Sequence, residues 1–143
     1  MTLRKRPPKS IGIVSSLPAN LYAQWRAQNL AAQSLQDADA RTPPPERFLQ
    51  QVWFHQRLLR DRLQTFDGRK VQVLHPGFWN REPGPDFRSA VLQFGDEPPR
   101  SGDVEVDLTP SGWRAHTHDR NPAYAGVILH VVWNARQGLV VPV

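Results

Sequence analysis

The chain contains no cysteine, so it can form neither a disulfide nor a thiolate metal site, and nothing in it indicates an oxidising compartment. Long hydrophobic runs are also missing, since the longest, Val127–Trp133, is far too short to span a membrane. The weak apolar stretch Ile11–Leu17 is interrupted by two serines, which argues against a signal peptide. We therefore expect a cytoplasmic protein without a membrane partner.

Common motifs of nucleotide binding and nucleophilic catalysis are absent as well. The sequence has no Gly-rich phosphate loop and no nucleophile elbow around a serine. At 143 residues the chain is long enough for one domain with a real core, but short for two. The remaining candidates for chemistry are acidic residues and histidines.

Positive charge is concentrated at the N-terminus. The net charge is +5 at pH 7, and Arg4, Lys5, Arg6 and Lys9 supply four of these charges, which leaves +1 for the rest. A basic arm of this kind can hold phosphate backbones through counterion release, so it predicts nucleic acid as a partner. The alternative is a solvated, disordered terminus without a binding role.

Residues 1–45 predict a flexible basic arm, a short helix and a proline-rich linker. A pair of early prolines excludes a helix near the start, so residues 1–17 are interpreted as a flexible lead-in. Apolar residues at helical spacing predict an amphipathic helix over Pro18–Gln36. Asp37–Pro45 ends in three consecutive prolines and marks a boundary before a second domain, residues 46–143.

The second part of the chain predicts a mixed α/β (α+β) domain. Apolar residues recur at three- and four-residue steps over Glu46–Leu63, which predicts a helix. Val127–Trp133 is nearly all apolar and β-branched, as is typical of a central buried strand. A helix followed by strands predicts a mixed central sheet with a flanking N-terminal helix. Further strands are predicted over Val71–Leu74, Ala90–Phe94, Asp103–Leu108, Trp113–His118 and Leu139–Val143.

Three acids stand where neighbouring strands could bring them together. Asp86 is at the entrance of one predicted strand, while Glu105 and Asp107 alternate along the next and so share a face. Such carboxylates could gather around one hard divalent cation such as Mg²⁺. A hairpin turn centred on Gly95-Asp96 places Asp86 opposite Glu105, whereas a turn centred on Pro98-Pro99 separates them. Alternatively, all three acids are solvent-facing strand residues.

Histidines offer a second kind of site. His116 and His118 would face the same way on a strand and could bind a transition metal together with Glu105 or Asp107. The alternative is that both are incidental surface residues. His130 lies inside the predicted central strand and is interpreted as a hydrogen-bonded core histidine.

Several motifs after residue 45 occur together in a specific combination. They are the helix Glu46–Leu63, Thr65–Gly68, Pro76-Gly77, Asn80, Gly84–Phe87, Gly102–Glu105, Trp113, His116–His118, Tyr124 and Val127–Val132. Through these motifs the chain resembles a bacterial family known as domain of unknown function 2851. Proteins of that family continue beyond the segment that resembles Gly138–Val143, so the resemblance implies a domain that is incomplete at its C-terminus.

Pro85-Asp86 and Glu105 also resemble, more distantly, the signature of the PD-(D/E)XK nuclease-like superfamily. That signature is Pro-Asp, then an acid, any residue and lysine, on a restriction-endonuclease-like core of helix, three-stranded meander, helix and strand. Glu46 would take the place of a helical glutamate found in some members. Asp107 stands where lysine is expected, which leaves the general base unassigned. Arg114–Tyr124, where the second helix is expected, is interpreted as a loop.

The resemblance to the PD-(D/E)XK superfamily implies a Mg²⁺-dependent nuclease that acts on phosphodiesters of DNA or RNA, whereas the first family carries no assigned activity. Asp86 and Glu105 would hold the metal, and Asp107 would be a further ligand or the base that orients water. His116 and His118 would contact the scissile phosphate or a second metal.

Arg88 or Arg114 would offset charge in the transition state of this nuclease. Two other classes of protein stay open as alternatives to a nuclease. One is a small β-rich protein that binds a transition metal through Glu105, Asp107 and the two neighbouring histidines. The other is a non-catalytic interaction domain, in which the acids and histidines are structural and no cation binds.

Overall fold

The computed structural model describes residues 7–13, 16–21, 23–25 and 44–133. None of the helices in these ranges has the length and apolar character needed to cross a membrane. In chain order the described elements are β1 (Lys9–Gly12), α2 (Glu46–Phe54), η2 (Arg60–Arg62), β2 (Val71–His75), β3 (Phe78–Trp79), β4 (Phe87–Phe94), β5 (Arg100–Asp107), α3 (Gly112–Ala115), η3 (His118–Arg120), η4 (Pro122–Tyr124) and β6 (Val127–Val132).

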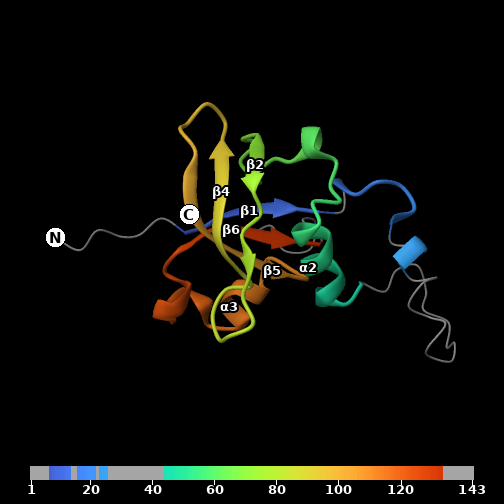
Figure 1. Cartoon of the computed structure of the whole chain (residues 1–143). Helices are drawn as coiled ribbons and strands as arrows, with labels where there is room; N and C mark the ends of the chain where they lie inside the picture. Colours follow the sequence, from blue (N-terminus) through green and yellow to red (C-terminus); the bar gives the residue numbers. More distant parts are fainter. Residues whose placement is uncertain (1–6, 14–15, 22, 26–43, 134–143) are drawn as a thin grey trace, which may run out of the picture.

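A mixed six-stranded sheet forms the body of the domain (Figure 1). Its strand order is β1-β6-β5-β4-β2, and the short β3 pairs with β4. Strands β2, β4 and β5 form an antiparallel meander, whereas β6 runs parallel to both β5 and β1. The predicted α+β class and the interior position of Val127–Val132 are therefore confirmed.

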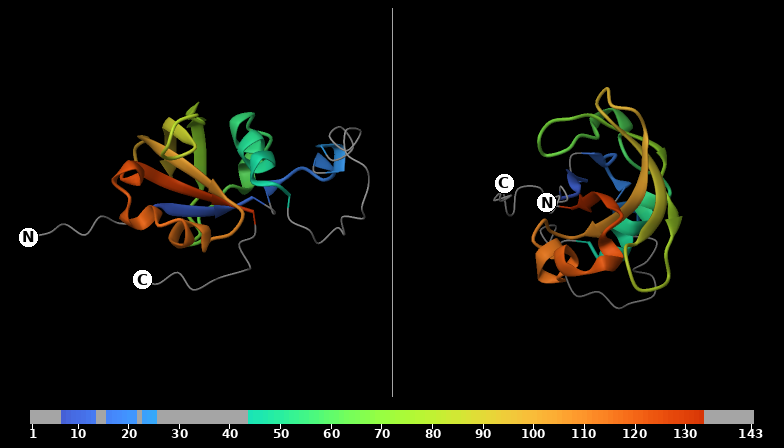
Figure 2. Two further views of the ribbon diagram at one scale, coloured as in Figure 1. Left: turned by 90° about the horizontal axis from the view of Figure 1, so that it is seen from below. Right: turned by 90° about the vertical axis from the view of Figure 1, so that its left-hand side faces the viewer.

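The sheet curls strongly instead of lying flat. In Figure 1, β4 and β2 run across the direction of β1 and β6, and Figure 2 shows the curvature from two further sides. Residues just ahead of β2 bridge the open side of the curl, because Thr65 pairs with Ile11 of β1 while Gln64 pairs with Lys70. The outer edge of β1 is thereby partly covered, which limits pairing with another chain.

The hydrophobic core lies on one face of the curled sheet. Alternate residues of β5 and β6 are fully buried in it, and α2 adds its apolar stripe. Because strand residues alternate between faces, the polar residues that lie between them project from the other side of the sheet. The buried core residues of these three elements are Val104, Val106, Leu129, Val131, Phe48, Leu49, Val52 and Trp53.

The hairpin between β4 and β5 turns at Gly95-Asp96. Phe87 pairs with Val104, and Ala90 pairs with Gly102, so Asp86 lies beside Glu105 near the C-terminal end of β5. This register confirms the first of the two predicted turns. Pro98-Pro99 precede β5 and so take no part in its hydrogen bonding.

Helix α2 ends at Phe54, well before the predicted end at Leu63. Its C-terminus has the hydrogen-bond pattern of a Schellman motif, because the Arg57 N–H donates to the Val52 carbonyl at 3.0 Å and Gln56 is left-handed, with φ of 51°. Glycine or asparagine normally marks such an end, and the sequence has neither here. Leu63 is buried, but from an irregular segment, so its helical spacing from the preceding apolar residues was misleading.

Strand β1 corrects the interpretation of residues 1–17 as a flexible lead-in. Lys9–Gly12 pairs with β6, and Ile11 is fully buried. Lys9 also forms an ion pair of 2.8 Å with Asp67. Most of the helix predicted over Pro18–Gln36, most of the linker after it and the whole of the last predicted strand lie outside the described residues.

The prediction of a strand over Trp113–His118 is also wrong. Helix α3 and the 3-10 turn η3 occupy this segment, and Thr117 between them adopts a left-handed conformation with φ of 58°. A further 3-10 turn, η4, begins at Pro122, whose fixed φ suits the first position of a helical turn. The segment is thus compact, and its turns fold back over β5 and β6.

Candidate metal centre

A cluster of acids and histidines occupies the face of β5 opposite the core. Strand β5 supplies Glu105 and Asp107, and Asp86 stands immediately before β4. The segment from α3 to η4 brings His116 and His118 against the two β5 acids. The structure therefore gathers all five predicted site residues in one region, while their role as metal ligands or catalytic groups stays a prediction.

Asp86 and Glu105 are fixed to each other through the backbone. The Asp86 N–H donates to Glu105 Oε2 at 3.0 Å, and the Val106 N–H donates to Asp86 Oδ2 at 3.0 Å. The amide of Gln50, on α2, donates to Asp86 Oδ1 at 3.0 Å. Both carboxylates are thus held on the same side of the sheet, with α2 fixing the orientation of Asp86.

Burial governs the protonation of these acids. Burial, reinforced by the charge of Asp86, raises the pKa of Glu105 to about 9. Burial also raises the pKa of Asp86 to about 6, although the hydrogen bond from the Val106 N–H opposes the shift. On α2, burial and the charge of Asp107 raise the pKa of Glu46. Without a cation, crowded carboxylates of this kind retain protons to higher pH than free ones.

Asp107 lies between two imidazoles. One of its oxygens is 2.8 Å from His130 Nε2, and the other is 3.4 Å from His116 Nδ1. Helix α3 approaches so closely that a Cβ on Gly112 would lie 2.7 Å from the Asp107 carboxylate, so only glycine fits there. His130 is buried and hydrogen-bonded as predicted, with Asp107 as its partner, but it lies on the face of the sheet that carries the cluster and not in the hydrophobic core.

His118 is buried without a hydrogen bond. Its side chain is 8% exposed, and neither ring nitrogen has a hydrogen-bond partner among the described residues. Nε2 is 3.2 Å from Glu105 Oε1, but this contact lacks hydrogen-bond geometry. The ring stacks on Tyr124 with centroids 3.8 Å apart and meets Trp113 edge-on. Burial lowers the pKa of His118 and so favours the neutral ring, which is the form that binds metals.

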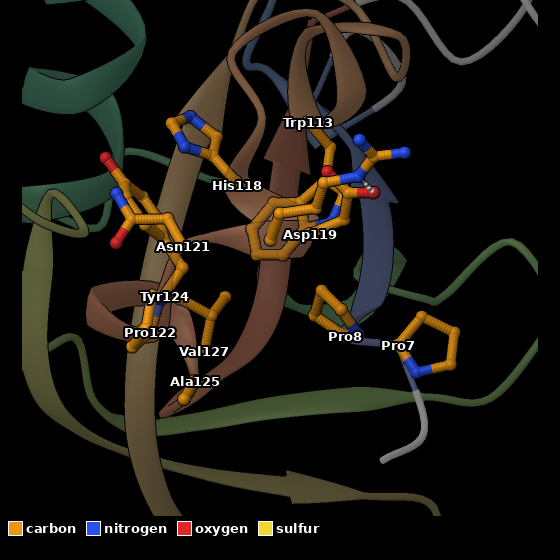
Figure 3. A pocket seen from close by; sticks show the side chains of 11 residues that line it. Pro7, Pro8, Trp113, His118, Asp119, Asn121, Pro122, Tyr124, Ala125 and Val127 are labelled. Carbon is orange, nitrogen blue, oxygen red and sulfur yellow. Dashed lines mark ion pairs between the residues drawn. The ribbon is translucent and has the colours of Figure 1, made fainter. Parts of the chain in front are cut away.

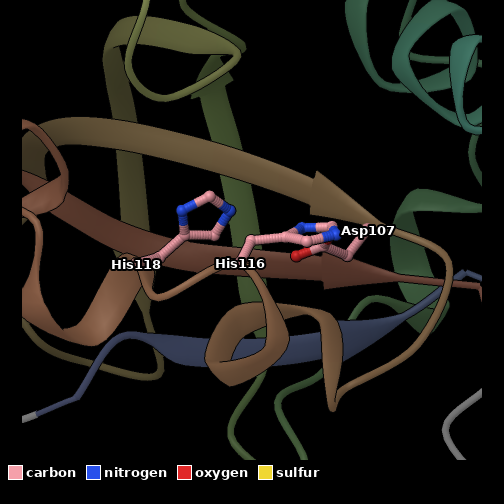
Figure 4. Close-up of side chains that lie close together, drawn as sticks. All are labelled: Asp107, His116 and His118. Atoms are coloured by element: carbon pink, nitrogen blue, oxygen red, sulfur yellow. The ribbon is translucent and has the colours of Figure 1, made fainter.

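Three of these side chains are placed to share one ion. A ligand atom from each of Asp107, His116 and His118 lies within 4.8 Å of the others. Figure 4 shows the His116 ring beside the Asp107 carboxylate, with the His118 ring on its other side. Zinc–nitrogen bonds are about 2.0 to 2.1 Å long, so each of the three ligand atoms would need to move by less than about 1 Å toward a shared ion.

Two structural partners of the cluster were missed in the sequence. Gln50 follows Glu46 by one helical turn, so the spacing alone places both on one side of α2. Tyr124 donates its hydroxyl hydrogen bond to the Gly84 carbonyl at 3.1 Å and so ties η4 to the loop before Asp86. The two predicted arginines, Arg88 and Arg114, are exposed, and their role in a transition state stays a prediction.

The fold and the cluster together define a mixed α/β domain with a buried carboxylate–histidine site. Residues 46–141 match the family described as "Protein of unknown function (DUF2851)", and the chain belongs to that family. No curated protein and no solved structure matches the chain significantly.

The raised pKa of Glu105 makes the stability of the metal-free protein depend on pH. Because the folded state keeps this proton up to about pH 9 while the unfolded chain loses it near pH 4.5, the folded state binds more protons between these values. The free energy of unfolding should therefore fall as pH rises through this window. Denaturant unfolding in a chelator at several pH values above about 6.5, where Asp86 has titrated, isolates the Glu105 contribution.

The matched control is Glu105→Gln, which keeps the oxygen that accepts from the Asp86 N–H but cannot ionise. Its unfolding free energy should depend much less on pH over the same range. Parallel profiles for the natural protein and the variant would show that Glu105 does not hold its proton in the folded state.

Proposed function

We propose that this domain is a metal-dependent hydrolase of the nuclease type, which cleaves phosphodiester bonds at the cluster on β5. The observation that carries the proposal is the buried His118 ring beside Glu105 and Asp107, because neither ring nitrogen has a hydrogen-bond partner in the described part of the chain. A buried polar group without a partner costs about 1–3 kcal/mol. A cation bound by one of the His118 ring nitrogens would remove the cost for that nitrogen. The same cation would also offset the repulsion between the neighbouring acids.

The donor atoms favour a transition metal over the Mg²⁺ expected from the acids alone. Two imidazoles and a carboxylate suit Zn²⁺ and related ions, whereas Mg²⁺ prefers oxygen ligands only. Asp107, His116 and His118 would be the protein ligands, and three such ligands leave a coordination position for water or substrate. The hydrogen bond from His130 would hold Asp107 in its orientation, as second partners of metal ligands commonly do.

The arrangement of the remaining acids supports hydrolysis of a phosphodiester. Asp86 at the entrance of β4, Glu105 on β5 and Glu46 on α2 converge around the same point, in the order that the PD-(D/E)XK resemblance implies. A bound cation supplies charge stabilisation for a phosphoryl oxygen and a more acidic water. In this scheme Asp86 and Glu105 orient the attacking water, while Asp107, which replaces the motif lysine, acts as a ligand.

A second candidate function is a metal site without catalysis. The stacking of His118 on Tyr124 and the close approach of Gly112 to Asp107 would suit a site that locks the α3–η4 segment onto the sheet. Such a site would bind the same ion but hydrolyse nothing. Binding and cleavage must therefore be measured separately.

Metal binding tests the ligand set. Isothermal titration of the chelator-treated protein should show one Zn²⁺ bound more tightly than Mg²⁺. His118→Ala and Asp107→Asn should each weaken Zn²⁺ binding by about 10-fold or more, since the first removes a ligand and the second removes the negative charge of another. His55→Ala, an exposed histidine at the end of α2, is the matched control and should bind Zn²⁺ as the natural protein does. Equal affinity in His118→Ala would refute the ligand assignment.

Cleavage tests the catalytic part of the proposal. Fluorescently labelled single-stranded DNA and RNA should be cut in the presence of Zn²⁺ or Mn²⁺ and left intact in a chelator. Asp86→Asn and Glu105→Gln should slow cleavage by about 100-fold or more, because groups that orient the attacking water act in the transition state. Asp96→Asn, in the exposed hairpin turn, should cut at the natural rate. Tight Zn²⁺ binding without any cleavage would favour the non-catalytic metal site.

A further inference from the structure

Two pockets lie side by side next to the cluster. The first has a volume of about 320 Å³ and the second about 280 Å³. Pro7, Pro8, Ala125 and Val127 line both, so the pockets meet along the residues that lead into β1 and the start of β6. Figure 3 shows the first pocket, with Trp113 and His118 on one side and the two prolines on another. We refer to these two adjoining pockets together as the trench.

The first pocket connects the trench to the proposed metal centre. His118 lines it, so its wall contains one of the proposed metal ligands. Trp113 and Tyr124 line it as well, and Asn121 adds hydrogen-bonding groups near its rim. Aromatic side chains together with polar amides suit a flat ring with polar edges, such as a nucleobase. The position beside His118 would place the phosphate of that nucleotide near the cluster.

The second pocket is cationic. Lys9, Arg69 and Arg100 line it, against a single acid, Glu97. Lys9 and Arg69 are engaged with acids, since both contact Asp67 and Arg69 also pairs with Glu97. Arg100 lies over a phenylalanine ring and has no carboxylate within ion-pair distance among the described residues. This guanidinium is available for an anion such as a backbone phosphate.

Positive charge is also present in the first pocket. Arg120 lines the first pocket with a side chain that is 86% exposed, and its contact with Asp119, which lines the same pocket, is a long ion pair of 3.9 Å. A polyanion that follows the trench would thus meet positive charge from the first pocket to the second.

We infer that this trench is a binding groove for single-stranded nucleic acid, with a base in the aromatic pocket and the backbone phosphates along the cationic pocket. The inference rests on the proposed function, for which it names the substrate class. A single strand is favoured over a duplex because a base can enter the first pocket only when it is free of its pairing partner. The shared contribution of cations and aromatic rings is typical of binding that does not depend on sequence.

Fluorescence anisotropy with short labelled single-stranded DNA and RNA tests the groove directly. The titrations are done in a chelator, so that metal binding plays no part. Arg100→Gln and Arg120→Gln should each weaken binding several-fold, and loss of one phosphate contact should lower the salt slope by about 0.7. Arg62→Gln, an exposed arginine in η2 that lines neither pocket, is the matched control and should bind as the natural protein does. Three results would contradict the proposed groove: an equal loss of affinity in all three variants, no loss of affinity in any of them, or tighter binding of duplex than of single strands.

One more variant separates this inference from the proposed function. Asp107 lines neither pocket, so Asp107→Asn should lose Zn²⁺ affinity and keep its affinity for the oligonucleotide. If the protein binds the oligonucleotide but no form of it binds Zn²⁺, the groove is supported and the metal centre is refuted. Zn²⁺ binding without any oligonucleotide binding would remove the groove alone.

Discussion

The cost of burying charge on one face of β5 is the constraint from which the site follows. The alternation of the strand sends Val104 and Val106 into the core and sends Glu105 and Asp107 to the opposite face, where both are almost fully covered. Backbone N–H groups, Gln50 and His130 offset part of the cost of burying these acids. The pKa of Glu105 is still raised, to about 9, because burial outweighs the hydrogen bond that it accepts from the Asp86 backbone. A cation at this point would supply the missing positive charge.

The segment from α3 to η4 supplies the two histidines of the cluster and also covers the acids of β5. Gly112 lets α3 approach Asp107, and Tyr124 both stacks on His118 and donates a hydrogen bond to the loop before Asp86. The cover is therefore fastened at both ends to the residues that it encloses. This arrangement holds His118 in a fixed place although its ring nitrogens make no hydrogen bond among the described residues. A side chain held in this way would need little rearrangement to bind a metal ion.

Much of the fold could be predicted from alternation and period, but local conformation could not. The apolar run of β6 and the shared face of Glu105 and Asp107 followed from the pattern alone, whereas the pattern allowed two turns between β4 and β5 and only the structure selects Gly95-Asp96. The early end of α2 depends on the left-handed conformation of Gln56. Glutamine does not favour that conformation, so the sequence contains no signal for it. The two histidines were predicted on a strand, yet they come together through a helical turn and a 3-10 turn, so their proximity was foreseen for the wrong reason. The pairing of Lys9–Gly12 with β6 depends on distant residues and left only a weak local signal.

The central claim is that imidazole nitrogen and carboxylate oxygen bind one metal ion on β5. X-ray absorption spectroscopy of the zinc-loaded protein tests it most directly, because it reports the atoms around the metal without reference to activity. The account predicts nitrogen and oxygen ligands at about 2.0–2.2 Å, with the outer-shell scattering of two imidazole rings. A first shell of oxygen alone, without imidazole scattering, would contradict it.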